Sequence, residues 1–249
     1  DLTWMNRAHQ SEQAVQAIGY IQAAGIQNIT IDLIYGTPTL SDEHWKKNVE
    51  QAIALHIPHL SCYALTVEPK TALHKMIQQK KVAGVDPEKQ SRHFEMLVQW
   101  MQDAGYEHYE ISNFAKPGFR SRHNSSYWQG THYLGIGPSA HSYNGNSRQW
   151  NISNNSLYIS AIQKGALPFE MEELTDTQQL NEYIMTSLRT IEGLSLQHIQ
   201  QHWSPAVKSI LEKSGKYIAQ GLMQHKNDTL ILTAKGKLFA DGIAAGLFQ

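Results

Sequence analysis

Two strand patterns with a helical pattern between them constrain the fold of this chain most. Residues 26–35 are rich in β-branched residues and predict a buried strand, and residues 59–66 predict a second strand. Residues 41–55, between them, carry apolar side chains at helical spacing. A helical pattern over 13–24 precedes the first strand, and a third short strand pattern covers 109–114. This order predicts parallel strands joined by right-handed crossovers, in either a barrel or a doubly wound sheet.

Capping residues mark three helix starts. Ser41 can accept a hydrogen bond from the first turn of the helix that follows it. Asp86 stands directly before Pro87, the order that favours an N-cap followed by the first helical position. Thr175 and Gln178 have the spacing of a capping box. These signals predict where the helices begin without reference to the apolar pattern.

The last part of the chain has a different character. Three helical patterns there precede two short β patterns joined by Asn227-Asp228, and Thr233 can cap a final helix. This order predicts a small winged-helix-like domain over 169–249. Residues 1–168 are then expected to form an α/β domain. Within it, residues 115–152 are rich in glycine and aromatic residues with little periodicity, as in functional loop regions.

Composition excludes several classes of protein. A net charge of -1 over 249 residues gives no basic excess for nucleic acid. No stretch approaches the roughly 20 apolar residues of a membrane span, and no secretory signal opens the sequence. Cys62 is the one cysteine, which excludes internal disulfides and a multi-cysteine metal site within this sequence. A reducing, cytoplasmic location is the expectation.

The start of the sequence looks cut, because it lacks an initiator methionine and a helical pattern begins almost at once. We expect a preceding strand to be missing. The strand over 26–35 would then have an unpaired, apolar edge, which predicts poor solubility or dimerisation of this chain alone.

Asp32 and Arg7 are candidate site residues. A carboxylate within a buried strand costs several kcal/mol unless it is paired, and Asp32 lies towards the carboxyl end, where barrel and doubly wound enzymes place their sites. The alternative is a structural ion pair with a helix. Arg7 precedes a helix, where an arginine can clamp a carboxylate or phosphate, although spacing alone favours a solvated surface residue.

Residues 120–128 combine two arginines, a histidine, an asparagine and two aromatic residues. Histidine ligates haem iron, arginine pairs with carboxylates and aromatic rings stack on flat ligands, so the segment suits a carboxylated porphyrin. A loop that hydrogen-bonds to itself is the alternative. The glycine-rich stretch 135–141 is compatible with an anion nest or with a tight turn. Cys62 is expected to be a small buried hydrophobe.

Several segments together resemble one family, the HemW group of radical S-adenosylmethionine proteins, which is related to oxygen-independent coproporphyrinogen III oxidase. They are Met5-Asn-Arg-Ala-His9, Asp32-Leu-Ile-Tyr-Gly-Thr-Pro38, Tyr63-Ala-Leu-Thr-Val-Glu-Pro69, Tyr109-Glu-Ile-Ser-Asn-Phe-Ala115, His123-Asn-Ser-Ser-Tyr-Trp128 and Tyr133-Leu-Gly-Ile-Gly-Pro138. The resemblance implies the later part of a partial triosephosphate-isomerase-type barrel, followed by a helical and winged-helix C-terminal region. The family's Cys-x-x-x-Cys-x-x-Cys cluster segment is not among these residues.

The resemblance also implies roles for particular residues. Arg7 and Asp32 match S-adenosylmethionine contacts of the family. Thr66 and His141 fall where the related oxidases place further contacts to that cofactor, although the residue types differ. His123 is the implied haem contact, supported by Tyr127 and Trp128.

The function implied is that of a haem chaperone, which binds haem and passes it to an acceptor protein, with peripheral membrane association through that acceptor. The [4Fe–4S] cluster and S-adenosylmethionine would belong to the complete barrel, with no cluster ligand in this chain. One alternative is an anaerobic coproporphyrinogen III oxidase. Another is an interaction module whose winged-helix part binds a protein or a nucleic acid, of which the charge disfavours the nucleic acid.

Overall fold

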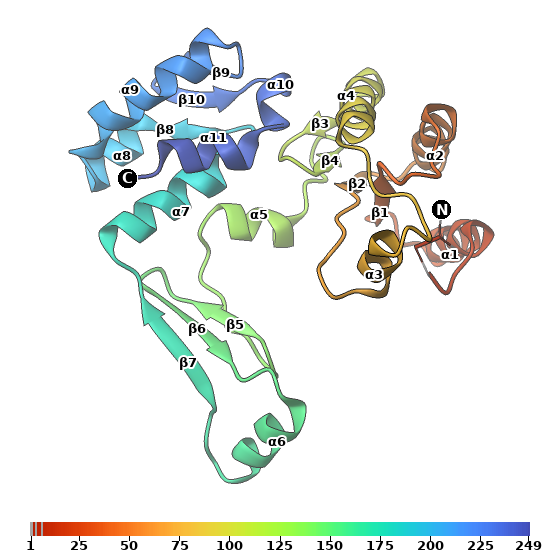
Figure 1. The fold of residues 1–249 in the computed structure, drawn as a ribbon, viewed down its shortest axis with the longest axis horizontal. Helices are drawn as coiled ribbons and strands as arrows, with labels where there is room; N and C mark the ends of the chain where they lie inside the picture. Colours follow the sequence, from red (N-terminus) through yellow and green to blue (C-terminus); the bar gives the residue numbers. More distant parts are fainter. Residues whose placement is uncertain (1, 3, 6) are drawn as a thin grey trace. The chain divides into compact units, whose positions relative to one another are not determined.

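The structure is a computed structural model that describes residues 2, 4, 5 and 7–249. The chain divides into two compact units, residues 1–121 and 122–249. Figure 1 shows the elements of each unit in sequence colours. The domain boundary expected at 168/169 stays a prediction. Strand β6 (Ser147–Asn151) lies before that position and pairs with β7 (Phe169–Glu173), which lies directly after it.

The first unit is built on one small sheet with helices around it. In chain order its elements are α1 (Ser11–Ala23), β1 (Thr30–Tyr35), α2 (Asp42–Ala54), β2 (His59–Ala64), α3 (Ala72–Gln78), α4 (Pro87–Asp103), β3 (Glu107–His108) and β4 (Asn113–Ala115). The strand order is β1-β2-β4-β3, and β1 and β2 are parallel, as predicted. The sheet is open, and the strands in the described residues do not close into a barrel.

The third strand does not continue the parallel pattern. β4 is antiparallel to β2, with Leu60 opposite Phe114, and it is also antiparallel to β3. The chain reverses between β3 and β4, where the Glu110 carboxylate accepts the Ser112 N–H at 2.9 Å. This local turn sends β4 back along β2, so a purely parallel sheet was the wrong expectation.

Helices α2 and α4 supply the core beside β1. Trp45, Val49 and Leu97 are fully buried. The predicted caps are confirmed, because the Ser41 side chain accepts the His44 N–H and the Asp86 side chain accepts the Glu88 N–H. These caps fix where the two helices begin.

The second unit begins with residues expected to form a long loop. They instead form α5 (Arg122–Trp128), β5 (His141–Tyr143) and β6, and the chain continues through α6 (Asn155–Gln163) into β7. The strand order is β5-β6-β7 with antiparallel pairing throughout. The strands are short and mostly polar, so they lack the alternation that would mark them in the sequence.

The end of the chain forms the predicted helical and hairpin unit. Its elements are α7 (Asp176–Leu188), β8 (Leu194–Ser195), α8 (Leu196–His202), α9 (Ala206–Ala219), β9 (Met223–Lys226), β10 (Thr229–Leu232), α10 (Ala234–Lys237) and α11 (Ala240–Leu247). Asn227 and Asp228 both have positive φ, 48° and 58°, as a tight hairpin requires. The capping box of Thr175 and Gln178 is present. The expected single last helix is split, because α10 ends before Phe239 and α11 follows.

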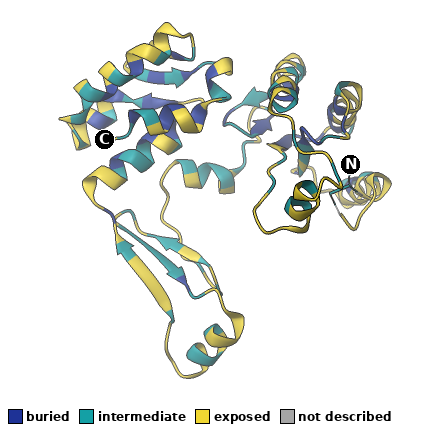
Figure 2. Ribbon diagram, viewed as in Figure 1, coloured by how far each residue is buried: buried dark blue, intermediate teal, exposed yellow. Residues whose placement is uncertain are grey.

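Burial is concentrated in two places. Figure 2 shows dark, buried segments in the strands and helices of the first unit and among α7–α11, whereas β5–β7 and α6 are mainly half-buried or exposed. In the described part of the chain, no helix combines the length and apolar character needed to cross a membrane.

Candidate functional site

One face of the first sheet is polar. The register places Asp32 beside Ser61 and Ser61 beside Asn113, and places Thr30 beside His59. Paired residues on neighbouring strands point to the same face, so these side chains form a polar surface across β1, β2 and β4.

Asp32 does not occupy the buried position that its strand pattern predicted. It is exposed, whereas Ser61 and Asn113 are 4% exposed each. The physical reason is its place in the sheet, because β1 is an edge strand and Asp32 has a neighbouring strand on one side. The alternative to a site residue, a structural ion pair between Asp32 and a helix, does not occur among the described residues. An exposed carboxylate on a polar sheet face remains suited to hold a polar ligand.

His59 is the residue on this face that the sequence reasoning missed. Its Nδ1 lies 2.7 Å from the Thr30 hydroxyl, and its Nε2 lies 2.7 Å from the Tyr109 hydroxyl. Burial lowers the pKa of His59, against an opposing effect from the Asp32 carboxylate. Cys62 on the opposite face is buried, and burial together with Asp32 raises the pKa of its thiol. The expectation of a small, buried cysteine is confirmed.

Two buried histidines, His59 and His93, and the half-buried His198 predict a pH-dependent stability. Burial lowers the pKa of His59, His93 and His198 in the fold below the ordinary value of 6.5. The unfolded chain therefore binds protons at mildly acidic pH that the fold excludes, and stability present above pH 6.5 is lost as the pH falls. We expect the free energy of unfolding to decrease between about pH 7 and pH 5, measured by urea denaturation of the full-length protein. His59→Gln should flatten this slope, and an equal or steeper slope would contradict the assignment.

The other predicted cofactor residues of the first unit are exposed. Arg7 lies in irregular chain before α1, and its N–H donates to the Leu2 carbonyl at 2.9 Å. Thr66 follows the carboxyl end of β2. Within the described residues, Arg7 and Asp32 share no ion pair. The structure thus places Asp32 on β1 and Thr66 two residues beyond the end of the neighbouring strand β2, and leaves Arg7 outside the sheet.

The haem-type residues of α5 belong to a series of aromatic rings. His123 and Tyr127 are both exposed, and their ring centroids are 5.2 Å apart in an edge-on arrangement. The ring centroids of Tyr127 and Tyr133 are 5.6 Å apart, and those of Tyr133 and Tyr143 are 6.1 Å apart. We call these four residues the aromatic ladder. Tyr133 and Tyr143 exchange two backbone hydrogen bonds of 2.9 Å, which hold the ladder together across the glycine-rich stretch.

Trp128 does not join His123 and Tyr127. It lies on another side of α5, where the Arg189 guanidinium is 5.4 Å from its ring centre. The Nε1–H of Trp128 and the Nε–H of Arg189 are buried, and neither has an acceptor in the described residues. Arg189 also binds the Asp241 carboxylate. Two buried donors without acceptors are costly, and a carboxylate is the group that such donors bind.

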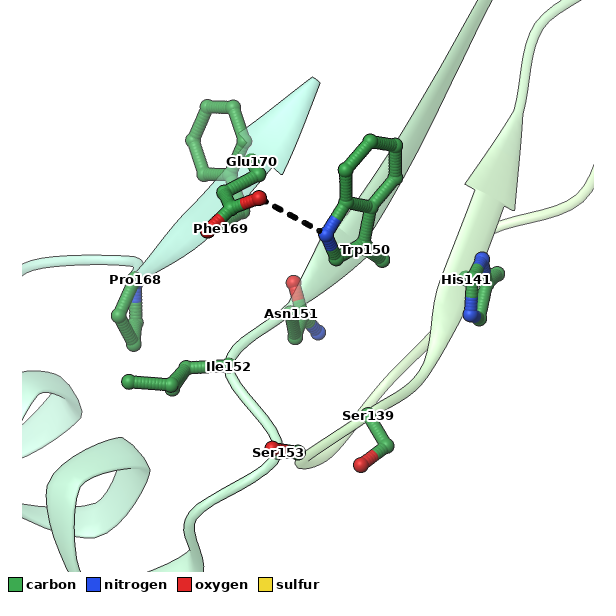
Figure 3. A pocket seen from close by; sticks show the side chains of 9 residues that line it. All are labelled: Ser139, His141, Trp150, Asn151, Ile152, Ser153, Pro168, Phe169 and Glu170. Carbon is green, nitrogen blue, oxygen red and sulfur yellow. Dashed lines mark hydrogen bonds between the residues drawn. The ribbon is translucent and has the colours of Figure 1, made fainter. Parts of the chain in front are cut away.

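His141 lines a cavity of about 460 Å³ at the end of the β5–β7 sheet. The register sets His141 beside Trp150 and Trp150 beside Glu170, and the Trp150 Nε1–H donates to Glu170 at 3.2 Å (Figure 3). Ser139, Ile152 and Pro168 complete much of the lining. None of the residues that line the cavity belongs to the aromatic ladder, and all of them lie in the second unit. The lining of the cavity therefore shares no residue with the sheet face that carries Asp32.

Known proteins give this arrangement a family context. Residues 174–239 match the HemN C-terminal domain. The chain is 32% identical over 247 residues to the heme chaperone HemW of Mycobacterium tuberculosis, covering 99% of this chain and 62% of that protein. It is 29% identical to heme chaperone HemW of Bacillus subtilis, covering 96% of this chain and 64% of that protein. The chain is related to the HemW proteins.

The solved structure of coproporphyrinogen III oxidase (HemN) from Escherichia coli, a radical SAM enzyme, matches the fold with a TM-score of 0.79. That match covers 100% of this chain and 61% of that chain at 20% identity. The expected fold class, a later part of the radical SAM fold followed by a winged-helix-like unit, is confirmed by this likeness. This chain therefore spans about three fifths of the HemW proteins of M. tuberculosis and B. subtilis and of the HemN structure.

Proposed function

We propose that this chain belongs to a haem chaperone that binds haem and passes it to an acceptor protein. The observation that carries the proposal is an exposed imidazole, His123, at the end of an aromatic ladder. A neutral imidazole is a haem-iron ligand, and Tyr127 and Tyr133 offer ring surface to a flat macrocycle. The names of the related HemW proteins support the same reading.

The unpartnered donors beside the ladder fit the carboxylates of haem. Trp128 and Arg189 each present a buried N–H that has no acceptor among the residues described by the structure. We propose that Trp128 contributes through this polar group, whereas His123 and Tyr127 contribute the iron contact and ring packing. This division follows from the two sides of α5 on which the residues lie.

S-adenosylmethionine is the second proposed ligand. Asp32, on the polar face of the first sheet, is suited to accept hydrogen bonds from a ribose or an amino group. Arg7 and Thr66 are proposed as further contacts, whereas the contact predicted for His141, which lies in the second unit, stays a prediction from the sequence. Bound there, the cofactor would supply the chemistry of radical SAM proteins, while Asp32, Arg7 and Thr66 would orient it.

The [4Fe–4S] cluster does not fit the residues of this chain. Cys62 is the one cysteine, and it is buried in β2. No group of three or more metal-ligating side chains occurs among the described residues. We propose that the cluster ligands lie elsewhere in the polypeptide, and that the protein acts in the cytoplasm. Self-association, or membrane association through the acceptor, is part of the same proposal.

A haem titration of the full-length protein tests the function. His123→Ala should weaken haem binding by about tenfold or more and change the Soret band, because it removes the iron contact. His225→Ala, which alters another exposed histidine on β9, is the matched control and should leave both unchanged. Identical Soret spectra and affinities for wild type and His123→Ala would remove the proposed ligand.

A second function, oxygen-independent coproporphyrinogen III oxidase, is favoured by the fold likeness to HemN. Reconstituted full-length protein incubated with coproporphyrinogen III distinguishes the two. Formation of protoporphyrinogen would favour the oxidase over the chaperone.

A further inference from the structure

Strand β7 has one backbone edge along which no other strand of the described residues pairs. It is the last strand in the order β5-β6-β7. The Ile152 N–H donates to the Pro168 carbonyl at 3.0 Å, and the Leu174 N–H donates to the Asn146 carbonyl at 2.8 Å. Since inward and outward residues alternate in an antiparallel pair, residues 170 and 172 direct their backbone groups towards β6.

Residues 169, 171 and 173 therefore direct their N–H and C=O groups away from the sheet. None of these groups has a hydrogen-bond partner within the part of the chain that the structure describes. The side chains on the same residues are also uncovered, because Phe169 is 46% exposed and Met171 is 54% exposed. An exposed edge of this kind is a template on which another strand can pair.

The charge of β7 selects the kind of strand that fits. Glu170, Glu172 and Glu173 are all exposed or half-buried on this strand. Arg148 forms an ion pair with Glu172, but it also binds Glu182 at 2.6 Å. This shared arginine does not neutralise the negative charge of the three glutamates on β7. A partner strand with basic residues opposite the glutamates would gain cross-strand attraction.

The same charge disfavours a second copy of this chain. Antiparallel pairing of two β7 strands about Met171 would place Glu170 of one copy opposite Glu172 of the other. Like charges directly opposite each other destabilise a strand pair.

We propose that β7 takes up an extended segment of a partner protein as an additional strand, in which basic residues alternate with apolar ones. The basic side chains lie opposite Glu170 and Glu172, and the apolar side chains lie against Phe169 and Met171. Main-chain hydrogen bonds to residues 169, 171 and 173 provide the pairing, as in other strand-addition complexes. Strand addition stands independently of the haem site, and identification of the partner with the haem acceptor rests on the proposed function.

The test uses the full-length protein and a fluorescent peptide of alternating lysine and valine. We expect saturable binding that weakens with salt, and no binding of a glutamate–valine peptide of equal length. Met171→Pro removes an outward N–H without removing a bond to β6, and should weaken binding about tenfold. Met171→Ala is the matched control, because it keeps the N–H, and should stay within about threefold of wild type.

Amide hydrogen exchange gives the second readout. The amides of 169, 171 and 173 should exchange fast in the free protein and become protected with the lysine–valine peptide. Circular dichroism of Met171→Pro verifies that the sheet is intact. If the sheet is disrupted in that variant, Glu173→Pro, which removes another outward N–H, replaces it and should weaken peptide binding in the same way.

Four results would overturn the proposal. They are absence of peptide binding, equal binding by Met171→Pro and wild type, protection of these amides in the free full-length protein, and a self-association that Met171→Pro abolishes. The haem titration is run on the same variants. If His123→Ala alone loses haem binding and still binds the peptide, the haem site and the strand edge are separate. Failure of the haem proposal can then be distinguished from failure of the strand-addition proposal.

Discussion

Gly135→Ala is expected to destabilise the fold by about 2–4 kcal/mol and to break the aromatic ladder. A Cβ at this position would lie 2.1 Å from the His141 carbonyl oxygen and 2.8 Å from the His141 nitrogen. Both atoms belong to the backbone of β5, so no side-chain rotation relieves the contact. The strand must move, and Tyr133 and Tyr143 then lose the backbone bonds that join them.

Urea denaturation and haem titration of full-length Gly135→Ala measure the two consequences. Gly215→Ala is the matched control, because its Cβ would meet nothing within 4 Å and the residue lies within α9. That control should be neutral or stabilising by up to about 1 kcal/mol. Equal stability and haem affinity of Gly135→Ala and wild type would show that the close approach of Gly135 and His141 does not hold the ladder.

Trp45→Ala is expected to cost about 3–5 kcal/mol of stability. Trp45 is 0% exposed, and its ring centre lies 5.5 Å from that of Tyr35. Its Nε1–H also donates to the His93 carbonyl at 3.1 Å. The alanine variant therefore leaves a cavity and also loses the side-chain hydrogen bond to the His93 carbonyl.

Two further variants separate those effects. Trp45→Phe retains most of the ring volume but removes the N–H, so its loss should be smaller than that of Trp45→Ala. Lys46→Ala changes the adjacent exposed residue and should stay within about 0.5 kcal/mol of wild type. Thermal and urea unfolding of the full-length variants provide the measurement, and a Trp45→Ala loss below that of Lys46→Ala would contradict the assigned core.

Local chemistry made much of the fold predictable. The caps at Ser41 and Asp86 depend on neighbouring residues, and the Asn227-Asp228 turn depends on two backbone conformations. The predictions of these caps and of this turn were correct because each feature is produced by residues close together in the sequence. The predicted direction of β4 was wrong because the turn at Glu110 reverses the chain. A strand pattern in the sequence does not show in which direction the strand runs relative to its neighbours.

Features that depend on distant pairing were not predictable. β6 has the sequence Ser-Arg-Gln-Trp-Asn, which has no apolar alternation, and it becomes a strand because β5 and β7 pair with it. The exposure of Asp32 likewise follows from the place of β1 at the edge of the sheet. In both cases the neighbours decide the outcome.

The candidate haem residues divide in the same way. His123 and Tyr127 are four residues apart on one helix, so their proximity follows from helical geometry. Tyr133 and Tyr143 meet through a backbone bridge that spacing does not reveal. Trp128 is set against Arg189 by packing of α5 on α7, which no local pattern encodes.

The contacts of His59 tie together parts of the first unit that are far apart along the chain. Thr30 on β1 meets one ring nitrogen, Tyr109 meets the other, and the Tyr109 hydroxyl also accepts the Ser121 N–H at 3.3 Å. Ser121 is the last residue before the chain enters the second unit. A tautomer exchange of this one imidazole reverses the donor and acceptor roles at both ring nitrogens, so the hydroxyl groups of Thr30 and Tyr109 must change their hydrogen-bond direction together.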